Sequence, residues 1–391
     1  MKDTLRIDDT PAAVDSAAWN ALLAQQAKPT PFMRHEFLSA LHASASAAAD
    51  TGWAPCFITL WRGRALRAGC ALYLKSHSYG EYVFDWAWAD AYERHGLNYY
   101  PKLLSAVPFT PVPGTRLLAV DAEARGLLLQ AITQLARNSE LSSAHLLFGD
   151  EADMAAAEAH GWMRRSTVQF HWHNRVDAPF ADFTDFLASL QREKRKKIQQ
   201  ERRRVAEAGV RFSVHHGPDI DTDLWDFFYR CYTRTYREHR STPYLTRDFF
   251  HRMAERMPDN WLLFIAEREG RHIAASLIAL DPEQRVAYGR YWGATEHVPL
   301  LHFEACYYQP LAWCIANGYQ RFEGGAQGEH KMARGLLPVR THSAHWLSAP
   351  RFASAVADFL QREGAGIDAY VDELQERNPF KRGAGPLPSA A

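Results

Sequence analysis

The chain has 391 residues, more than one hydrophobic core usually organises, so its length predicts two domains. Hydrophobic residues make up 47% and charged residues 23%, and no run approaches the ~20 apolar residues that cross a bilayer, so we expect a soluble protein without a transmembrane segment. Lysine plus arginine and aspartate plus glutamate number 45 each, so any binding to a polyanion must depend on a local patch.

The N-terminal segment lacks the features of a secretory signal. It begins Met1-Lys2-Asp3-Thr4 and continues into an acidic, alanine-rich stretch, without a basic start followed by an apolar run. The five cysteines form no CxxC pair and lie mostly in apolar segments, as reduced core thiols do. We therefore expect a cytoplasmic protein.

The first half of the chain predicts a hairpin followed by alternating strands and helices. Apolar runs on both sides of Arg62-Gly63 predict the hairpin. An aromatic segment, residues 76–106, separates it from the elements that follow. These are a strand at 108–112, a helix at 122–138, a strand at 145–148, a helix at 151–160 and a strand at 166–173.

The second half repeats this order after a turn-rich boundary at 174–179. A helix is expected at 183–208, ended by Gly209. A hairpin follows around Glu269-Gly270. The later elements are a strand at 286–292, a helix at 302–316, strands at 321–323 and 341–347, a helix at 351–376 and a disordered tail at 379–391.

The matching order indicates an internal repeat. The interval from Gly149 to Trp172 nearly equals that from Gly324 to Trp346, and only the aromatic segment lacks a counterpart in the second half. We interpret residues 76–106 as an insertion. The predicted domains are 1–178, 179–350 with a basic helix at 183–208, and a C-terminal helix and tail at 351–391.

Long motifs in both halves resemble the FemAB-like family, whose fold is a tandem pair of GNAT acyltransferase domains. The resemblance implies an α/β (α+β) fold with mixed, mostly antiparallel sheets flanked by helices. The motifs that carry it are His77-Ser78-Tyr79-Gly80-Glu81-Tyr82-Val83-Phe84-Asp85-Trp86, Phe170-His171-Trp172-His173-Asn174, Tyr291-Trp292-Gly293, Phe303-Glu304-Ala305-Cys306-Tyr307-Tyr308, Arg321-Phe322-Glu323-Gly324-Gly325 and Gly328-Glu329-His330-Lys331 with Arg334-Gly335-Leu336.

The resemblance implies an N-acyltransferase whose activated donor is a co-substrate, with no tightly bound cofactor. Better-known family members transfer an amino acid from aminoacyl-tRNA to an amine of a peptidoglycan precursor, whereas true GNAT enzymes use acyl-CoA. The glycine-rich turn that holds the coenzyme A pyrophosphate is missing before the second-half helix, at Gly293-Ala294-Thr295-Glu296. Its absence favours tRNA, while the acceptor can be a precursor or another small amine.

A basic helix offers a binding surface for tRNA phosphates. Residues 192–204 carry eight lysines or arginines against two glutamates. Our candidates for phosphate contacts are Lys194, Arg195, Lys197 and Arg203. The alternative is a solvated helix whose charges pair within the molecule.

Acyl transfer to an amine needs a base, a stabiliser of the oxyanion and an acid for the leaving group. The resemblance places these groups where the central strands of the second half diverge. Candidate catalytic residues are Glu323, His302, Tyr291 and Lys331. Candidate substrate-binding residues are Arg290, Glu304, Gln327, His330 and Arg334.

The aromatic segment of the first half predicts an acceptor site. Asp85, Trp86, Trp88 and Lys102 combine aromatic walls with charges that could orient a polar ligand. The alternative is a surface flap whose aromatic rings cover the insertion.

A metal site and a function without catalysis are two further alternatives. His171 and His173 share one strand face and could bind zinc with His215 or His216, but no other ligand stands at zinc spacing, so we expect no metal. A protein that binds without catalysis, on a degenerate GNAT scaffold, is the main alternative to an enzyme. It predicts a closed central sheet with Glu323 buried in a salt bridge.

Overall fold

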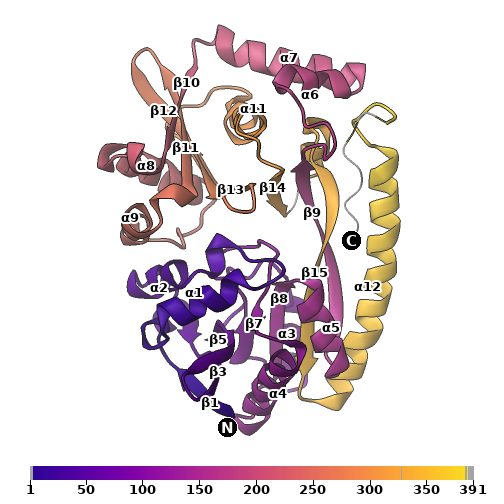
Figure 1. Ribbon diagram of the computed structural model, residues 1–391. Coiled ribbons are helices and arrows are strands. Elements are labelled where there is room, and N and C mark those ends of the chain that lie inside the picture. The colour runs from indigo at the N-terminus through magenta and orange to yellow at the C-terminus, as the bar shows by residue number, and fades with distance from the viewer. Residues whose placement is uncertain (1–2, 327, 384, 386–391) are drawn as a thin grey trace. The chain divides into compact units, whose positions relative to one another are not determined.

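The computed structural model describes residues 3–326, 328–383 and 385 (Figure 1). The chain forms two compact units. Unit 1 comprises Met1–Thr167 and Arg340–Tyr370, and unit 2 comprises Val168–Val339 and Val371–Ala391. Three elements contain residues of both units: β9 Met163–His173, β15 Leu337–Leu347 and α12 Pro350–Glu376.

Unit 1 contains two sheets, with strands in the orders β1-β3-β4-β7 and β15-β8-β6-β5-β2. Its helices are α1 Ser16–Ala24, α2 His35–Ala43, α3 Trp86–Arg94, α4 Ala122–Asn138 and α5 Glu151–Ala159. Its other strands are β1 Asp3–Asp8, β2 Trp53–Pro55, β3 Phe57–Arg62, β4 Ala65–Cys70, β5 Leu72–Lys75, β6 Lys102–Ser105, β7 Leu117–Ala119 and β8 Ser143–Gly149.

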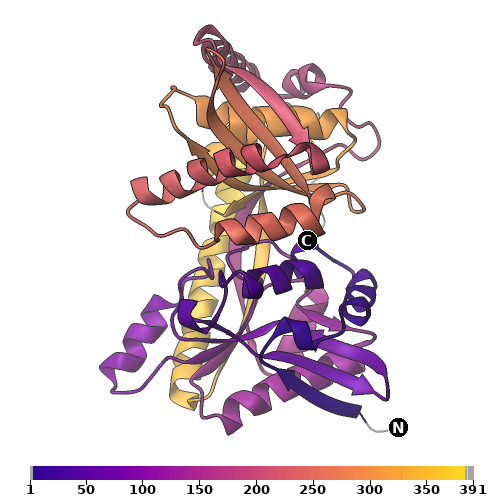
Figure 2. The same ribbon diagram turned by 90° about the vertical axis from the view of Figure 1, so that its left-hand side faces the viewer.

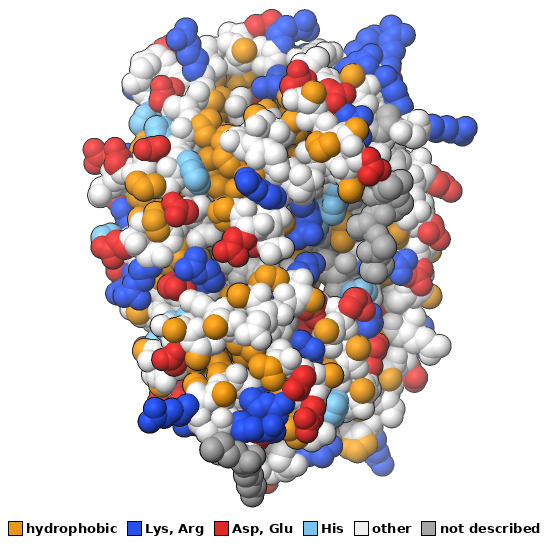
Figure 3. All heavy atoms as spheres, in the orientation of Figure 1, with side chains coloured by type: hydrophobic (Ala, Val, Ile, Leu, Met, Phe, Trp, Pro, Cys, Tyr) orange, Lys and Arg blue, Asp and Glu red, His pale blue; other side chains and the backbone are white. Residues whose placement is uncertain are grey.

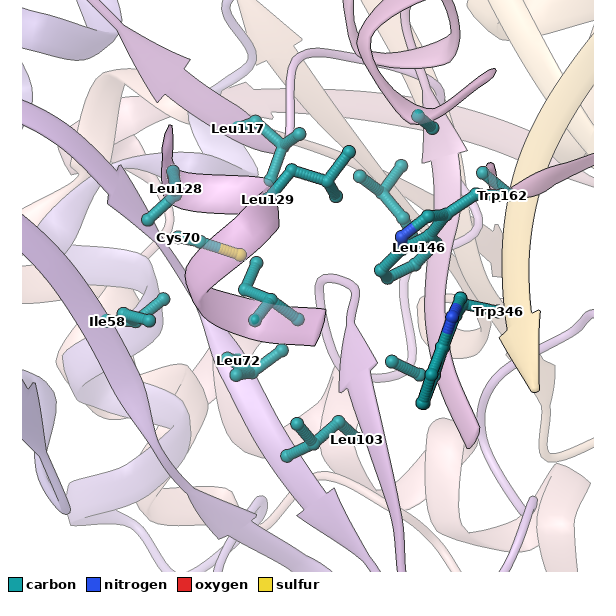
Figure 4. Close-up of a cluster of buried hydrophobic side chains, with 14 of the residues drawn as sticks. Ile58, Cys70, Leu72, Leu103, Leu117, Leu128, Leu129, Leu146, Trp162 and Trp346 are labelled. Carbon is teal, nitrogen blue, oxygen red and sulfur yellow. The ribbon is translucent and has the colours of Figure 1, made fainter. Parts of the chain in front are cut away.

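The core of unit 1 forms around α4. Asp121 caps this helix by accepting a hydrogen bond from the Ala124 amide, at 2.7 Å. Its apolar face places Leu128 and Leu129 among strand residues such as Cys70 and Leu146, all buried (Figure 4). Residues of both sheets of unit 1 belong to this cluster, so α4 holds the two sheets in one core.

Unit 2 is built on one sheet, with the order β10-β11-β12-β13-β14-β9. Its strands are β10 Arg211–His216, β11 Trp261–Arg268, β12 Arg271–Asp281, β13 Val286–Ala294 and β14 Arg321–Ala326. Its helices are α6 Phe183–Ser189, α7 Arg192–Glu207, α8 Thr222–Glu238, α9 Arg247–Arg256, and a continuous helical segment of α10 Leu301–Phe303, a π-helical turn Glu304–Tyr308 and α11 Gln309–Ala316.

Helices cover both faces of this sheet: α8 lies on one and α11 on the other (Figures 1 and 2). The central strand β12 is accordingly apolar and buried along nearly its whole length. Gly293 of β13 allows α8 to approach closely, since a Cβ there would lie 2.1 Å from the Cys231 carbonyl oxygen. The middle of α8 therefore packs directly on β13.

The two units share one strand plan. In unit 2, β13 runs parallel to β14, and β14 pairs antiparallel with β9. In unit 1, β6 runs parallel to β8, and β8 pairs antiparallel with β15. The final strand of each sequence half therefore pairs within the other unit.

This exchange changes the domain boundaries relative to the sequence prediction of 1–178, 179–350 and 351–391. Residues 340–370 belong to unit 1 because β15 pairs with β8. The strand expected at 108–112 is also absent. The counterpart of β13 is β6, which lies inside the segment 76–106 that we interpreted as an insertion.

Two other predicted elements differ. The helix expected at 183–208 is broken between α6 and α7, where Leu190 is extended and forms a bridge with Phe380. The tail expected to be disordered from 379 is ordered at its start, since the Lys381 amide donates to the Ser189 carbonyl (2.9 Å) and Phe380 is buried. Positions 384 and 386–391 of that tail lie outside the described residues.

Candidate active site

A cavity of about 140 Å³ opens in unit 2 where β13 and β14 diverge. Their parallel pairing ends at Tyr288 and Glu323. A β-bulge at Arg290 bends β13 here, because the register with β12 shifts between Leu277 and Ile278. The walls come from β12, β13, β14 and the helical segment: Ser276, Ile278, Gly289, Arg290, Tyr291, Trp292, His302, Cys306, Tyr307, Phe322 and Gly324.

The helical segment supplies one wall through its π-helical turn. His302 precedes the turn, and Cys306 and Tyr307 lie within it. A π-turn inserts a residue into the helical ladder and is frequent at functional sites, because it redirects side chains. Here it faces Cys306 toward Ser276 of β12, whose hydroxyl lies 3.8 Å from the sulfur.

Three of the predicted residues meet at this cavity. The Arg290 guanidinium donates to the Tyr291 hydroxyl at 3.0 Å, so a cation lies beside the phenol. His302 packs edge-on against Trp292, with ring centroids 5.5 Å apart. Desolvation by these neighbours, with the positive charges of His330, Arg334 and Lys331, lowers the pKa of His302 to about 4. His302 is therefore neutral at pH 7, which leaves it able to accept a proton but makes it a weak base.

Lys331 lies beside the cavity, at its β14 wall. Its ammonium donates to the carbonyl oxygens of Gly324 (2.6 Å) and Gly325 (3.2 Å). The side chain is 5% exposed, and burial lowers its pKa to about 8. A group that titrates near neutral pH suits proton transfer.

Glu323 is buried and is not among the residues that line the cavity. Strand residues alternate between faces, and its neighbours Phe322 and Gly324 are the ones that line it. The Glu323 carboxylate lies 3.0 Å from Arg321 Nε and 3.9 Å from His171 Nε2. Glu323 is thus held in an ion pair.

The other predicted substrate-binding residues are dispersed. Glu304 pairs with Arg202 at 3.1 Å and lines a different groove. Arg334 is buried against Glu201, at 3.0 Å. His330 Nε2 lies 3.3 Å from the hydroxyl of Tyr307, a cavity residue, whereas Gln327 lies outside the described residues.

The basic helix α7 presents its charges to solvent, and Figure 3 shows lysine and arginine side chains gathered there. Only two of its eight cations form an ion pair within the described part of the chain, Arg202 with Glu304 and Arg203 with Glu207. Lys194, Arg195 and Lys197, predicted for phosphate contacts, are exposed or half-buried. These charges are thus available to an anionic partner.

In unit 1, the predicted acceptor-site residues Asp85 and Lys102 form a buried polar network. The Lys102 ammonium donates to Asp85 Oδ2 (2.5 Å), Glu81 Oε2 (2.8 Å) and Ser78 Oγ (2.8 Å). Tyr99 donates a further hydrogen bond to Asp85, at 2.6 Å. Trp88 is also buried, whereas Trp86 is 37% exposed, so the four predicted residues do not share one surface.

Burial and charge act in opposite directions on the carboxyls of this network. Desolvation raises the pKa of Glu81 to about 7 and outweighs the attraction of Lys102. At Asp85 desolvation is also the largest influence, but the attraction of Lys102 and His145 and the hydrogen bonds from Lys102 and Ser78 together outweigh it and hold the pKa well below its usual range. Glu81 is the member of the network that titrates near neutral pH.

The raised pKa of Glu81 predicts a loss of stability with rising pH. The folded state holds this proton more tightly than the unfolded state, so the contribution is complete below about pH 4.5 and disappears as pH rises through about 7. We expect the free energy of unfolding to fall by roughly 2–3 kcal/mol from this group between pH 5 and 8. Glu81→Gln should remove that decline in urea titrations at the two pH values. The exposed control Glu93→Gln should keep it, and an equal slope in both variants would contradict the assignment.

Sequence reasoning missed Cys306, Tyr307, Ser276 and the network residue Tyr99. Cys306 stands four positions after His302, a spacing that places two helix side chains on one face, so part of this wall was predictable. Ser276 carried no signal, because its neighbours in the strand are apolar on both sides.

The two histidines considered as zinc ligands lie on β9. His171 and His173 lie with ring centroids 6.4 Å apart, and the Nε2 of His171 is 3.1 Å from the Gln169 amide oxygen. Within residues 3–326, 328–383 and 385, no three His, Cys, Asp or Glu side chains group as a metal site would require.

The fold and the cavity define a class of protein, a tandem pair of GNAT-like units. FemX has this fold: its crystal structure aligns with 91% of this chain and 100% of its own, at 10% identity and a TM-score of 0.55. L-PGS from Bacillus licheniformis aligns over 88% of this chain and 97% of its own, at 10% identity and a TM-score of 0.52. The C-terminal domain of a putative lysylphosphatidylglycerol synthetase from Agrobacterium fabrum aligns over 89% and 96%, at 10% identity and a TM-score of 0.51.

The model of the FemAB-like family, described as peptidoglycan biosynthesis and recognition, matches residues 10–382, and the chain belongs to this family. Curated proteins give no significant match. The family and the fold confirm the resemblance and the fold class predicted from the motifs. In the described part of the chain, no helix is both long and apolar enough to cross a membrane.

Proposed function

We propose that the protein is an N-acyltransferase that moves an acyl or aminoacyl group from an activated donor to an amine. The observation that carries this proposal is the cavity between the diverging strands β13 and β14, with a neutral histidine, a phenol and a lysine of lowered pKa around it. These are the groups that acyl transfer requires.

Each group has a role in the proposed reaction. His302 takes the proton of the attacking amine, which is possible because its imidazole is neutral. The Tyr291 hydroxyl, polarised by Arg290, faces the oxyanion of the tetrahedral intermediate. Lys331 donates a proton to the departing oxygen as the bond to the donor breaks.

The proposed donor is aminoacyl-tRNA, and the proposed acceptor is an amine of a peptidoglycan precursor. In the loop where GNAT enzymes hold the coenzyme A pyrophosphate, this chain has Glu296, whose carboxylate lies 3.4 Å from Arg271 and also pairs with Arg268. Both arginines are already engaged by this carboxylate, and the loop lacks the glycine-rich turn whose amides would hold the pyrophosphate. The cations of α7 favour an RNA backbone instead.

Mass spectrometry of the acceptor tests this proposal. The purified protein is offered a muramyl pentapeptide with either charged total tRNA or acetyl-CoA. We expect a mass gain of one amino acid from charged tRNA, abolished by RNase. Transfer from acetyl-CoA that resists RNase would replace the tRNA donor with coenzyme A.

A binding protein without catalysis is the second candidate. The ion pair between buried Glu323 and Arg321 favours it, because a glutamate held in this way is not available as a base. The open sheet beyond Tyr288 disfavours it. Binding of the pentapeptide without transfer from any donor would support this candidate.

A further inference from the structure

A second cavity of unit 2 has the composition of a separate binding site. It has a volume of about 430 Å³, within the range of small-molecule pockets. It is formed by α6, α7, the start of β10 and the helical segment that also borders the reaction cavity. We call it the arginine groove, after Arg202, Arg203 and Arg211 in its lining.

One of these arginines is fixed in place. Arg202 Nε pairs with Glu304 at 3.1 Å, and its guanidinium lies 4.7 Å from the centre of the Phe183 ring. The Gln309 amide donates to the same carboxylate at 2.7 Å. Glu304 is 4% exposed, so its charge is balanced by Arg202 inside the protein. This arrangement leaves the groove with a preformed wall and a surplus of positive charge.

The surplus comes from the other two arginines. Arg203 is exposed, and its partner Glu207 is a solvated neighbour one turn along α7, at 3.7 Å. Such an exposed pair is weak, so Arg203 can turn toward a ligand at little cost. Arg211 is also exposed at the start of β10. Two guanidiniums beside one cavity favour a phosphate, which they can bind in a bidentate manner.

The rest of the lining is not that of a simple anion site. Leu187, Val205, Val210 and Phe212 provide apolar and aromatic surface, and Gln199 adds an amide that both donates and accepts. Inorganic phosphate would leave the apolar surface unused, and a lipid chain would leave the arginines unused.

We infer that the arginine groove binds a nucleotide, with its phosphate on Arg203 and Arg211 and its base against Phe212. A free nucleotide and the unpaired end of an RNA share this chemistry. The inference depends on the groove alone and stands whether or not the protein transfers acyl groups.

Competition binding tests the inference on the full-length protein. A short fluorescent single-stranded RNA is titrated by anisotropy, and AMP, adenosine and inorganic phosphate are offered as competitors. We expect AMP to bind directly in calorimetry, more tightly than adenosine or phosphate, since only AMP provides both a base and a phosphate. Arg203→Gln with Arg211→Gln should weaken AMP binding at least about 10-fold, because two charge-assisted contacts are lost.

The control is Lys196→Gln with Arg204→Gln, which removes the same charge from α7 outside the groove. It should change AMP affinity by no more than about 2-fold. AMP that displaces the RNA identifies an RNA end as the source, and AMP that binds without displacing it identifies a free nucleotide. The inference is overturned if AMP does not bind, if phosphate or adenosine binds as tightly, or if both double variants lose affinity equally.

Discussion

The variant Lys102→Met is expected to unfold with a free energy about 3–5 kcal/mol below that of the wild type. Lys102 is fully buried and is the cation for two carboxylates, Asp85 and Glu81. Methionine fills a similar volume but leaves the Asp85 carboxylate buried without its counter-charge and removes the hydrogen-bond donor of Glu81. The loss therefore exceeds what the deletion of a surface ion pair would cause. Urea unfolding at pH 7 measures it.

A matched control separates burial from charge. Arg252→Met removes a pair with Asp248 one turn away on the exposed face of α9, and it should cost only about 0.3–0.5 kcal/mol. Adding Asp85→Asn and Glu81→Gln to Lys102→Met should recover part of the stability, since no unpaired charge then remains. If Lys102→Met costs no more than Arg252→Met, the network does not stabilise unit 1.

The variant Lys331→Met should lower kcat/KM of the proposed transfer by about 10²–10³-fold, because the leaving oxygen loses its proton donor. With a pKa of about 8, Lys331 is protonated at pH 7 and loses its proton as pH rises. The wild-type rate should therefore fall above about pH 8. The measurement is a pH profile of single-turnover transfer.

Lys331→Arg tests whether the proton or only the charge matters. Arginine can still donate to the Gly324 and Gly325 carbonyls, which preserves the loop, but it does not release a proton in this pH range. We expect it to melt like the wild type, to remain poorly active and to lose the decline near pH 8. A wild-type rate for Lys331→Arg would reduce Lys331 to an electrostatic anchor.

Local patterns in the sequence were sufficient for most elements of unit 2. The hairpin, β13, the helical segment and β14 follow from apolar runs and turn glycines, which are properties of neighbouring residues. The pairing of β15 with β8 brings together segments from opposite halves of the chain, and no local pattern encodes it. For the same reason β6 was hidden in the aromatic segment: its four residues become a strand only between β5 and β8.

The candidate site shows the same limit. Arg290, Tyr291 and His302 could be placed at the cavity because they lie on β13 and at the start of the helix after it, beside the point where β13 and β14 diverge. The direction in which the Glu323 side chain points could not be predicted. It depends on the pairing of β14 with β9, which places Glu323 opposite His171. The π-helical turn is likewise set by packing, and it decides that Cys306 and Tyr307 face the cavity while Glu304 faces the arginine groove.

The exchanged final strands have a consequence for synthesis on the ribosome. Unit 1 is the first to leave the exit tunnel, yet β8 must wait for β15, which is made after all of the unit 2 helices and strands. Until then β8 presents an open edge, which other nascent chains could pair with. The order of translation and the order of folding therefore differ in this protein, because the sheet of unit 1 is completed only by the last strand to be made.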